Sequence, residues 1–312
     1  MINFRYHIVS LMAVFLALAV GITVGVTLSP SVDEGILTQA QQDRKQVTDL
    51  RNELSRRNSL DAYRSTYDQR TGPLVLAGEM PDARVALVVM PDAPGAVVTA
   101  IGDAVDQAGG RVVSEVQVSE EVFDPDQAAA VDQAVAELRP VGLTDEMSPA
   151  TKVGWSLSRA IGSRSVTARD EYARTVGRTL SAAGLVDVRE DTDDTAQLVV
   201  VVTAPTVVPA EATDVVTARV QLETGLREQG GTDDRVAVVV AGPNSDGLDG
   251  TDVGAIRATS PASSELSTVD VADLPSGVVT TVLAGKEQLL GRQGHYGALA
   301  RADDALPAVP VR

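Results

Sequence analysis

The stretch Arg84–Met90, RVALVVM, is an uninterrupted apolar run that is rich in β-branched residues. Runs of this kind are typical of strands that are buried on both faces, as in a parallel sheet. Two similar runs follow, QLVVVVT at Gln197–Thr203 and RVAVVVA at Arg235–Ala241. Together the three runs predict the central strands of one parallel β-sheet.

Helical patterns separate the predicted strands. The turn PDAPG at 91–95 is followed by a helix at Ala96–Gln107 and a strand at Arg111–Val118, which completes a β-α-β unit. Further elements are predicted at Asp126–Leu138, Ala150–Ile161, Ala168–Ala183, Glu211–Glu228 and Gly277–Leu290 (helices) and at Ser267–Val271 (a short strand). The alternation predicts an α/β domain over residues 72–302, with a parallel sheet of the Rossmann- or flavodoxin-like class covered on both faces. Residues 303–312 are predicted to form a loose tail.

Residues 31–71 have the composition of a long helix. Pro30 and Pro73 bracket the segment, and no glycine occurs between Ile36 and Thr71. A heptad frame that shifts by one residue near Arg57 places apolar residues at the contact positions, namely Ile36, Val47, Leu50, Leu54, Leu60 and Tyr63. The pattern predicts a helix at Val32–Gln69 that forms a coiled-coil stalk. The alternative is a lone amphipathic helix folded back on the domain.

The segment Ile8–Leu28, IVSLMAVFLALAVGITVGVTL, holds 21 residues without a charge. A helix rises about 1.5 Å per residue, so this segment can cross a hydrocarbon core of about 30 Å. We therefore predict that residues 1–30 form a short cytoplasmic N-terminus and a single helix that anchors the chain in the lipid bilayer. The alternative is a cleaved signal peptide, although the apolar core exceeds the usual length of about 7–15 residues and no A-x-A-like cleavage site follows.

The charges that flank this segment indicate its orientation. Arg5 precedes it, and the first charges after it are Asp33 and Glu34. Positive residues stay on the cytoplasmic side, so we expect a single-pass protein of the cell membrane whose bulk is extracytoplasmic. Gly21 and Gly25 have the spacing at which two membrane helices approach closely, which favours a dimer contact, although glycine is common in membrane helices generally.

Composition and motifs limit the possible functions. The formal net charge is −17, which argues against a nucleic-acid partner. The chain has no cysteine, so it forms neither disulfides nor thiolate metal sites. It also lacks the nucleotide-binding patterns G-x-G-x-x-G and G-x-x-x-x-G-K-[ST] and the G-x-S-x-G nucleophile elbow. No set of residues predicts an enzyme, and no cofactor site is evident.

Candidate metal ligands are scattered along the chain. His295 is the only histidine in the predicted exported part, so one subunit cannot assemble a histidine-based triad or a multi-histidine metal site. We interpret the motif that contains it as a structural turn, formed by Gly294, His295, Tyr296 and Gly297.

Two acidic segments are interpreted as exposed turns. The segment Asn244–Asp252, NSDGLDGTD, resembles part of a calcium loop, but Ala255 stands where the loop needs a bidentate glutamate. The aspartates Asp191, Asp193 and Asp194 likewise predict an exposed turn.

Three stretches of the chain resemble the actinobacterial MctB family. They are the opening MINFRYHIVSLMAVFLALAVGITVG, the strand and turn RVALVVMPDAPG, and the closing STVDVADLPSGVVTTVLAGKEQLLGRQGHYGALARADDALP. The most specific marks are the pattern at Arg5–Ala19 and the GHYG motif at Gly294–Gly297. The resemblance covers nearly the whole chain, and it implies a single N-terminal anchor, a coiled-coil segment and an exported α/β domain.

Two functions follow from this resemblance. The family is described as copper transporters, which implies copper transport or homeostasis. Its SteB members act in septation, where they work with a SteA-like membrane partner and promote a peptidoglycan hydrolase.

The residues themselves favour a scaffold. One hydrophobic helix forms no pore alone, the sequence shows no alternating strands of the kind that an outer-membrane barrel needs, and the exported part offers neither cysteine nor a methionine cluster as copper ligands. We expect a non-catalytic, homodimeric scaffold of the cell envelope. Copper transport through an oligomer and a SteB-like role in septation are the alternatives.

Overall fold

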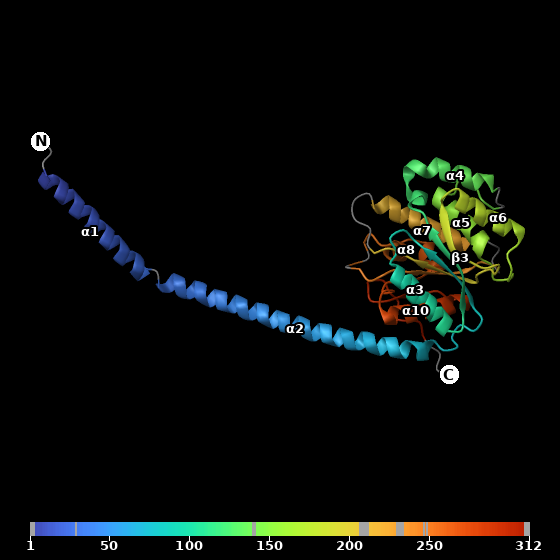
Figure 1. Cartoon of the computed structure of the whole chain (residues 1–312), viewed down its shortest axis with the longest axis horizontal. Coiled ribbons are helices and arrows are strands. Elements are labelled where there is room, and N and C mark those ends of the chain that lie inside the picture. The colour runs from blue at the N-terminus through green and yellow to red at the C-terminus, as the bar shows by residue number, and fades with distance from the viewer. Residues whose placement is uncertain are drawn as a thin grey trace. The chain divides into compact units, whose positions relative to one another are not determined.

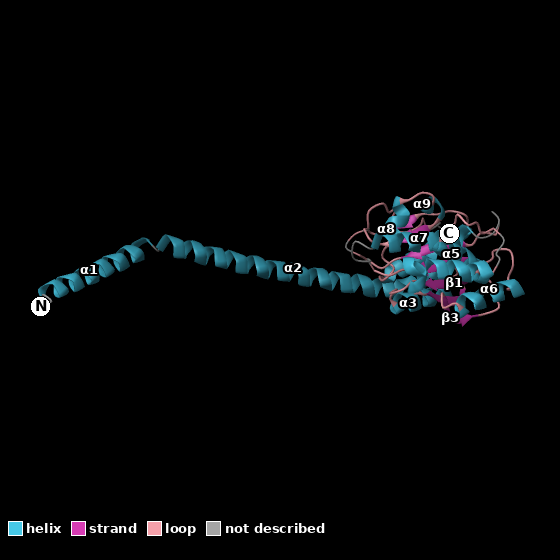
Figure 2. Ribbon diagram, turned by 90° about the horizontal axis from the view of Figure 1, so that it is seen from above, coloured by secondary structure: helices cyan, strands magenta, loops and turns pink. Residues whose placement is uncertain are grey.

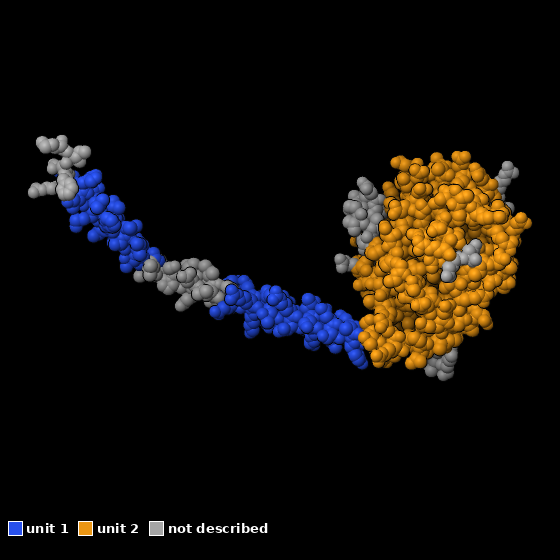
Figure 3. Space-filling view, viewed as in Figure 1, with its two compact units in different colours: residues 1–64 blue, residues 65–312 orange. Residues whose placement is uncertain are grey.

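The computed structural model describes residues 4–28, 30–138, 142–205, 212–228, 234–245, 247 and 249–308. The chain divides into two compact units, Met1–Arg64 and Ser65–Arg312, which Figure 3 colours separately. Within the described residues the first unit is wholly helical, and the second contains every strand.

The first helix, α1, spans Phe4–Leu28 (Figure 1). Its segment Tyr6–Gly25 is, among the residues that the structure describes, the one helix long and apolar enough to cross a membrane. Large apolar side chains such as Phe15 and Leu16 are exposed along it, as suits a helix that is surrounded by lipid rather than by a protein core. The prediction of an apolar N-terminal helix of membrane-spanning length is confirmed.

The second helix, α2, spans Pro30–Leu76 and has 47 residues (Figure 2). Pro30 occupies its first position, where the missing N–H has no helical partner to lose. At the other end the helix continues beyond the predicted Gln69, through Gly72 and Pro73. Leu76 is buried in the core of the second unit, and a Cβ on Gly72 would lie 3.1 Å from a methyl group of Val279. Tertiary packing of this last turn therefore outweighs two helix-breaking residues.

Seven strands form one sheet in the order β3-β2-β1-β4-β5-β6-β7. Their bounds are Arg84–Val89 (β1), Arg111–Val118 (β2), Val186–Asp191 (β3), Leu198–Val202 (β4), Ala237–Ala241 (β5), Ser267–Val269 (β6) and His295–Tyr296 (β7). All neighbouring strands are parallel except β3, which pairs with β2 in the antiparallel sense. A mixed α/β fold with a largely parallel sheet is confirmed, whereas the prediction of an entirely parallel sheet is wrong at this edge.

The edge strand β3 was not predicted from the sequence. Its residues, VDVRED, alternate apolar and charged side chains over most of their length, which is typical of a strand with one solvated face. Asp191 ends this strand, so the expectation that it lies in an exposed turn is wrong. Asp193 and Asp194 follow β3 and form ion pairs with Arg174 and Arg111.

The helices of the second unit lie between and after the strands. Their bounds are Gly95–Gln107 (α3), Ala128–Glu137 (α4), Pro149–Ile161 (α5), Glu171–Ala182 (α6), Ala212–Glu228 (α7), Asp252–Ala258 (α8), Ala262–Glu265 (α9) and Pro275–Leu289 (α10), with 3₁₀ turns at Glu120–Phe123 (η1) and Pro125–Gln127 (η2). The two short helices α8 and α9 were not predicted, because neither is long enough to show a helical period.

Two hydrophobic clusters cover the two faces of the sheet. Alternate residues of β1 point to opposite faces, so that Ala86 and Val88 join one cluster while Val85 and Leu87 join the other. The first cluster is completed by α4 to α8, and the second by α3, α10 and the end of α2. Figure 1 shows the corresponding helices above and below the sheet. Burial of both faces explains why the central strands are continuous apolar runs.

Candidate functional site

The predicted contact residues of α2 lie on the surface of this helix. Val47, Leu50, Leu54, Leu60 and Tyr63 are each between 45% and 68% exposed. Ile36 also belongs to α2, but its side chain lies outside the described part of the structure. The five described side chains form what we call the apolar stripe of α2.

Charged residues around the middle of the stripe pair within the helix. Glu53 accepts hydrogen bonds from Arg56 and Arg57, and Asp61 accepts one from Arg64. Arg56 and Arg57 lie in the region where the heptad frame shifts, between Leu54 and Leu60. These pairs form within one helix, and the side chains of the apolar stripe stay exposed beside them.

The described glycines of the predicted membrane contact lie on an open surface of α1. A Cβ added at Gly21 or Gly25 would meet no atom within 4 Å. The two residues are four apart in one helix, so their Cα atoms lie on nearly the same side of it.

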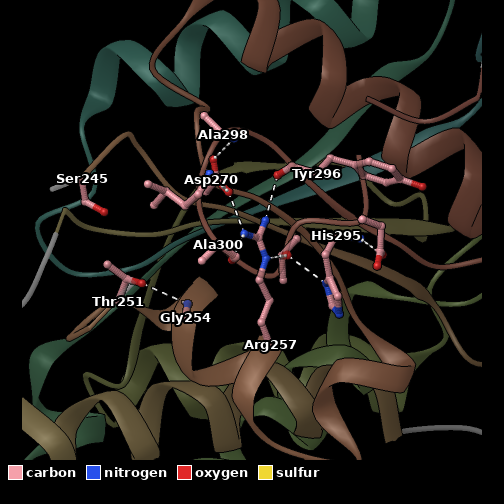
Figure 4. A network of polar contacts seen from close by, with 12 residues as sticks. Ser245, Thr251, Gly254, Arg257, Asp270, His295, Tyr296, Ala298 and Ala300 are labelled. Atoms are coloured by element: carbon pink, nitrogen blue, oxygen red, sulfur yellow. Dashed lines mark hydrogen bonds and ion pairs between the residues drawn. The ribbon is translucent and has the colours of Figure 1, made fainter. Parts of the chain in front are cut away.

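The GHYG motif forms the last strand and is part of a buried polar network (Figure 4). The Nδ1 atom of His295 lies 2.9 Å from the hydroxyl oxygen of Thr268, and its Nε2 lies 3.0 Å from the carbonyl oxygen of Ser263. The carbonyl can only accept, so we assign the proton to Nε2 and let the Thr268 hydroxyl donate to Nδ1. Burial and the nearby Arg257 lower the pKa of His295, which keeps the ring neutral. Both ring nitrogens are therefore engaged in structural hydrogen bonds.

Arg257 of α8 and Asp270, which follows β6, form the centre of this network. The guanidinium donates to Asp270 at 2.6 Å, to Thr268 at 2.8 Å and to the carbonyl of Tyr296 at 2.8 Å. Asp270 also accepts a hydrogen bond from the backbone N–H of Ala298 at 2.7 Å. Figure 4 shows the guanidinium pointing at these acceptors from the α8 side.

The glycine at the end of the motif is required by this arrangement. Gly297 has a φ of 134°, and a Cβ there would lie 2.0 Å from a carboxylate oxygen of Asp270. The Tyr296 hydroxyl donates to Glu287 of α10, and burial together with this carboxylate raises the pKa of Tyr296. The predicted motif at Gly294–Gly297 is thus part of one polar network. Two members of this network, Arg257 and Asp270, were not predicted from the sequence.

The end of the described chain also joins this network. The backbone N–H of His295 donates to the Asp303 carboxylate at 2.8 Å, and the N–H of Asp303 donates to the His295 carbonyl at 2.7 Å.

Acidic and histidine side chains do not gather into a metal site in the part of the chain that the structure describes. No group of three or more of them is close enough there to hold a metal ion. In the segment that resembles a calcium loop, Asp246 lies outside the described residues. Asp252 is buried at the start of α8, so the expectation of a wholly solvated turn is wrong at this residue.

A crevice of about 720 Å³ opens beyond the carboxyl ends of β1 and β2. The crevice is lined by the segment after β1, the segment after β2 and the first turns of α7. The lining residues are Pro91, Asp92, Glu120, Glu121, Phe123, Asp124, Pro125, Asp214, Val215 and Arg219. Because β1 lies between β2 and β4, the strand order reverses here, and open α/β sheets bind ligands at such reversals. The sequence predicted only the turn at 91–95, since the other walls come from segments that are distant in the chain.

Three ionisable side chains are buried beneath this crevice. They are Arg219 and Glu223, one turn apart on α7, and Asp252 of α8. A guanidinium nitrogen of Arg219 lies 3.9 Å from the Asp252 carboxylate, and its central carbon lies 5.7 Å from the centre of the Phe123 ring. Burial and the neighbouring Asp252 raise the pKa of Glu223 well above its usual range, and burial raises the pKa of Asp252 to about 6. Both carboxyl groups therefore hold their protons to a higher pH than exposed carboxyl groups do.

These features define the class of the protein. It combines one N-terminal apolar helix of membrane-spanning length, a second long helix with exposed apolar side chains, and an α/β unit on a largely parallel sheet. The chain belongs to the MctB family, whose model is described as "Copper transport outer membrane protein, MctB" and matches residues 1–307. The family resemblance seen in the sequence is confirmed.

Two relatives illustrate the similarity. A protein named "Copper transporter MctB" from Mycobacterium tuberculosis (strain H37Rv) is 29% identical over 315 residues, covering 95% of this chain and 96% of the relative. The protein of the same name from Mycobacterium bovis shows the same identity and coverage.

Proposed function

We propose that this chain is a membrane-anchored, non-catalytic scaffold of the cell envelope that forms a homodimer through α1 and α2. The observation that carries the proposal is the apolar stripe of α2. Its residues keep a heptad spacing on each side of one shift, and their side chains remain exposed on a single helix. A second copy of the same helix supplies the matching surface, as in a two-stranded coiled coil.

The membrane part supports the same arrangement. Gly21 and Gly25 present a surface without side chains on α1, where a second membrane helix can approach closely. The charges that flank the segment favour a cytoplasmic N-terminus, which leaves residues 29–312 outside the cytoplasm. In this arrangement the same two copies of the chain pair through α1 in the membrane and through α2 outside it.

A role in copper transport or homeostasis is consistent with the family to which the chain belongs. We infer that the scaffold serves such a role through assembly with other envelope proteins rather than as a copper ligand. The supporting observation is that His295, the candidate copper ligand, uses both of its ring nitrogens in hydrogen bonds.

Copper titration of the full-length chain tests this point. We expect no stoichiometric site that depends on the histidine, so that His295→Gln binds copper as the unchanged chain does. Tight binding at a defined ratio that disappears in His295→Gln would show that the residue is a copper ligand and would contradict the proposal.

A SteB-like role in septation is the second candidate. It requires only a dimerising helix and a domain that binds a membrane partner of the SteA type, and the crevice beyond β1 and β2 offers the domain a binding surface. Recovery of such a partner and of a cell-wall hydrolase by crosslinking in the native envelope would support it. Recovery of copper-handling proteins alone would exclude it.

The absence of cysteine allows a direct test of the dimer. A single cysteine at Leu54 is expected to give a disulfide-linked dimer on mild oxidation in native membranes, because the same residue of the second copy lies opposite it. Asn52→Cys is the matched control, since this exposed residue lies away from the apolar stripe. Equal crosslinking of the two variants, or none in either, would contradict the proposal.

A further inference from the structure

The rim of the crevice beyond β1 and β2 is acidic. Five exposed carboxylates stand around it, contributed by Asp92, Glu120, Glu121, Asp124 and Asp214. They come from three separate segments of the chain, which the fold brings to one end of the sheet. An acidic rim of this kind attracts a positively charged group and repels a simple anion.

The lining of the crevice also includes a buried cation. The Arg219 side chain is only 6% exposed, yet it lines the crevice. Its Nε and Nη1 atoms form no hydrogen bond with any residue that the structure describes, and its ion-pair partner, Asp252, is as far as 3.9 Å away. Two buried guanidinium nitrogens without a hydrogen bond are costly, so an acceptor that reaches this group from the crevice is favoured.

The crevice is also lined by apolar side chains. Pro91 and Phe123 are buried, and Val215 is half-buried. The ring of Phe123 also packs against the Arg219 guanidinium, which fixes the orientation of the cation. A ligand with two opposite charges joined by a short apolar stem matches these three kinds of lining residue.

Electrostatics decide between the possible ligands. A lone anion is repelled by the five carboxylates, and a lone cation is repelled by Arg219. Within the described residues the carboxylates do not converge tightly enough to hold a metal ion. A molecule with both charges avoids each repulsion.

We propose that this crevice binds a zwitterion of the amino-acid or short-peptide class. The ligand carboxylate pairs with Arg219, its stem lies on Pro91, Phe123 and Val215, and its ammonium group lies among the rim carboxylates. This inference goes beyond the scaffold proposal, because binding of the ligand does not require a second copy of the chain.

Calorimetric titration of the full-length chain in detergent tests the ligand class. The zwitterionic probes are 6-aminohexanoate and the dipeptide alanyl-lysine, and the single-charge analogues are hexanoate and hexylamine. We expect at least one zwitterion to bind at millimolar concentration or below, and both analogues to bind about tenfold more weakly. Failure of both zwitterions to bind, or equal binding of either analogue, would overturn the proposal.

Variants locate the site. Arg219→Lys keeps the charge that faces Asp252 but loses the forked donor, so we expect the better zwitterion to bind about tenfold more weakly. Asp92→Asn combined with Glu121→Gln alters only exposed rim residues and is expected to weaken binding of the same probe by a similar factor. Asp103→Asn combined with Asp106→Asn, which removes the same two charges at exposed residues of α3, is the control for the rim variant. Unchanged binding in both the Arg219 and the rim variants would place the ligand elsewhere and contradict the proposal.

Discussion

Arg257 illustrates how this fold accommodates a charge in its interior. The guanidinium is fully buried and pairs with Asp270, and it also donates to the Thr268 hydroxyl and to the carbonyls of Tyr296 and Ala300. Asp270 in turn accepts from the backbone N–H groups of Ala298 and Leu299. The network therefore ties the GHYG segment to α8 and β6. The motif is specific in sequence because it must fit around this ion pair.

Removal of the cation should destabilise the protein strongly. Arg257→Met leaves the Asp270 carboxylate buried without its partner, and we expect the free energy of unfolding to fall by about 3–5 kcal/mol. Chemical denaturation of the full-length chain in detergent measures the change. Arg178→Met, at an exposed residue of α6, is the control and should change the free energy by less than about 0.5 kcal/mol. A similar small loss in both variants would show that the buried pair is not central to stability.

Glu223 predicts a distinct dependence of stability on pH. Its pKa is raised in the folded state above the ordinary value of 4.5, so above that pH the folded state holds a proton that the unfolded state has released. The free energy of unfolding must then fall as the pH rises, at about 1.4 kcal/mol per pH unit, until the folded-state pKa is passed. Asp252, whose pKa is raised to about 6, adds a contribution of the same sign between about pH 4 and 6.

Glu223→Gln removes the first of these contributions. Glutamine resembles the protonated acid, so the variant should gain stability relative to the unchanged chain as the pH rises above about 4.5. Thermal denaturation over a pH series measures the difference, with Glu137→Gln at an exposed residue of α4 as the control. Parallel pH profiles for the unchanged chain and Glu223→Gln would contradict the raised pKa of Glu223.

At the scale of elements, the closest helix contact in the second unit joins α5 and α7. A Cβ on Gly154 would lie 2.0 Å from the carbonyl oxygen of Leu222, and a Cβ on Gly225 would lie 2.3 Å from that of Thr151. The two helices therefore approach through their backbones, and a methyl group at either position forces them apart. This contact places α7, and with it Arg219, against the rest of the fold.

Alanine at Gly225 should separate this helix pair. We expect Gly225→Ala to lower the free energy of unfolding by about 1–3 kcal/mol, because overpacking outweighs the better helix propensity of alanine. Gly177→Ala in α6 is the matched control, since its new Cβ would lie 3.8 Å from the nearest atom, the Cβ of Ala160. The control should be neutral or more stable by up to about 1 kcal/mol. Denaturant titration distinguishes the two, and a Gly225→Ala variant as stable as the control would refute the close contact.

The elements also show how far the sequence could predict the structure. Buried strands such as β1 and β4 were predicted because both of their faces require apolar residues, whereas β3 was missed because one of its faces is solvated. The end of α2 was missed because its stability comes from the burial of Leu76, which depends on distant residues. Local sequence patterns therefore predict elements such as the central strands, whose residues are all buried. They fail where contacts with distant residues determine whether an element forms.

The candidate sites also differ in how far the sequence could predict them. The GHYG motif is contiguous, so the sequence could identify it, but its partners Arg257 and Asp270 lie in other elements and carry no local signal. The crevice is assembled from the ends of several elements, and Arg219 within α7 is not distinguished from any other helical arginine. Only the order of the strands brings these residues together.

At the scale of the whole molecule, the scaffold proposal explains why a long helix carries exposed apolar side chains. Leu50 and Leu54 are each about 60% exposed, and their burial against a second copy is expected to drive association. The family model matches the chain from the N-terminal helix to residue 307, which includes α2 and its stripe.

The most direct test of this account is the number of chains in one particle. Native mass measurement of the full-length protein, released from lipid nanodiscs, should give two chains for the unchanged protein. It should give one for Leu50→Glu combined with Leu54→Glu, because four like charges at the interface oppose pairing. Arg51→Glu combined with Asn52→Glu, off the stripe, should remain dimeric. A single chain in the unchanged protein, or an intact dimer in the stripe variant, would contradict the central claim.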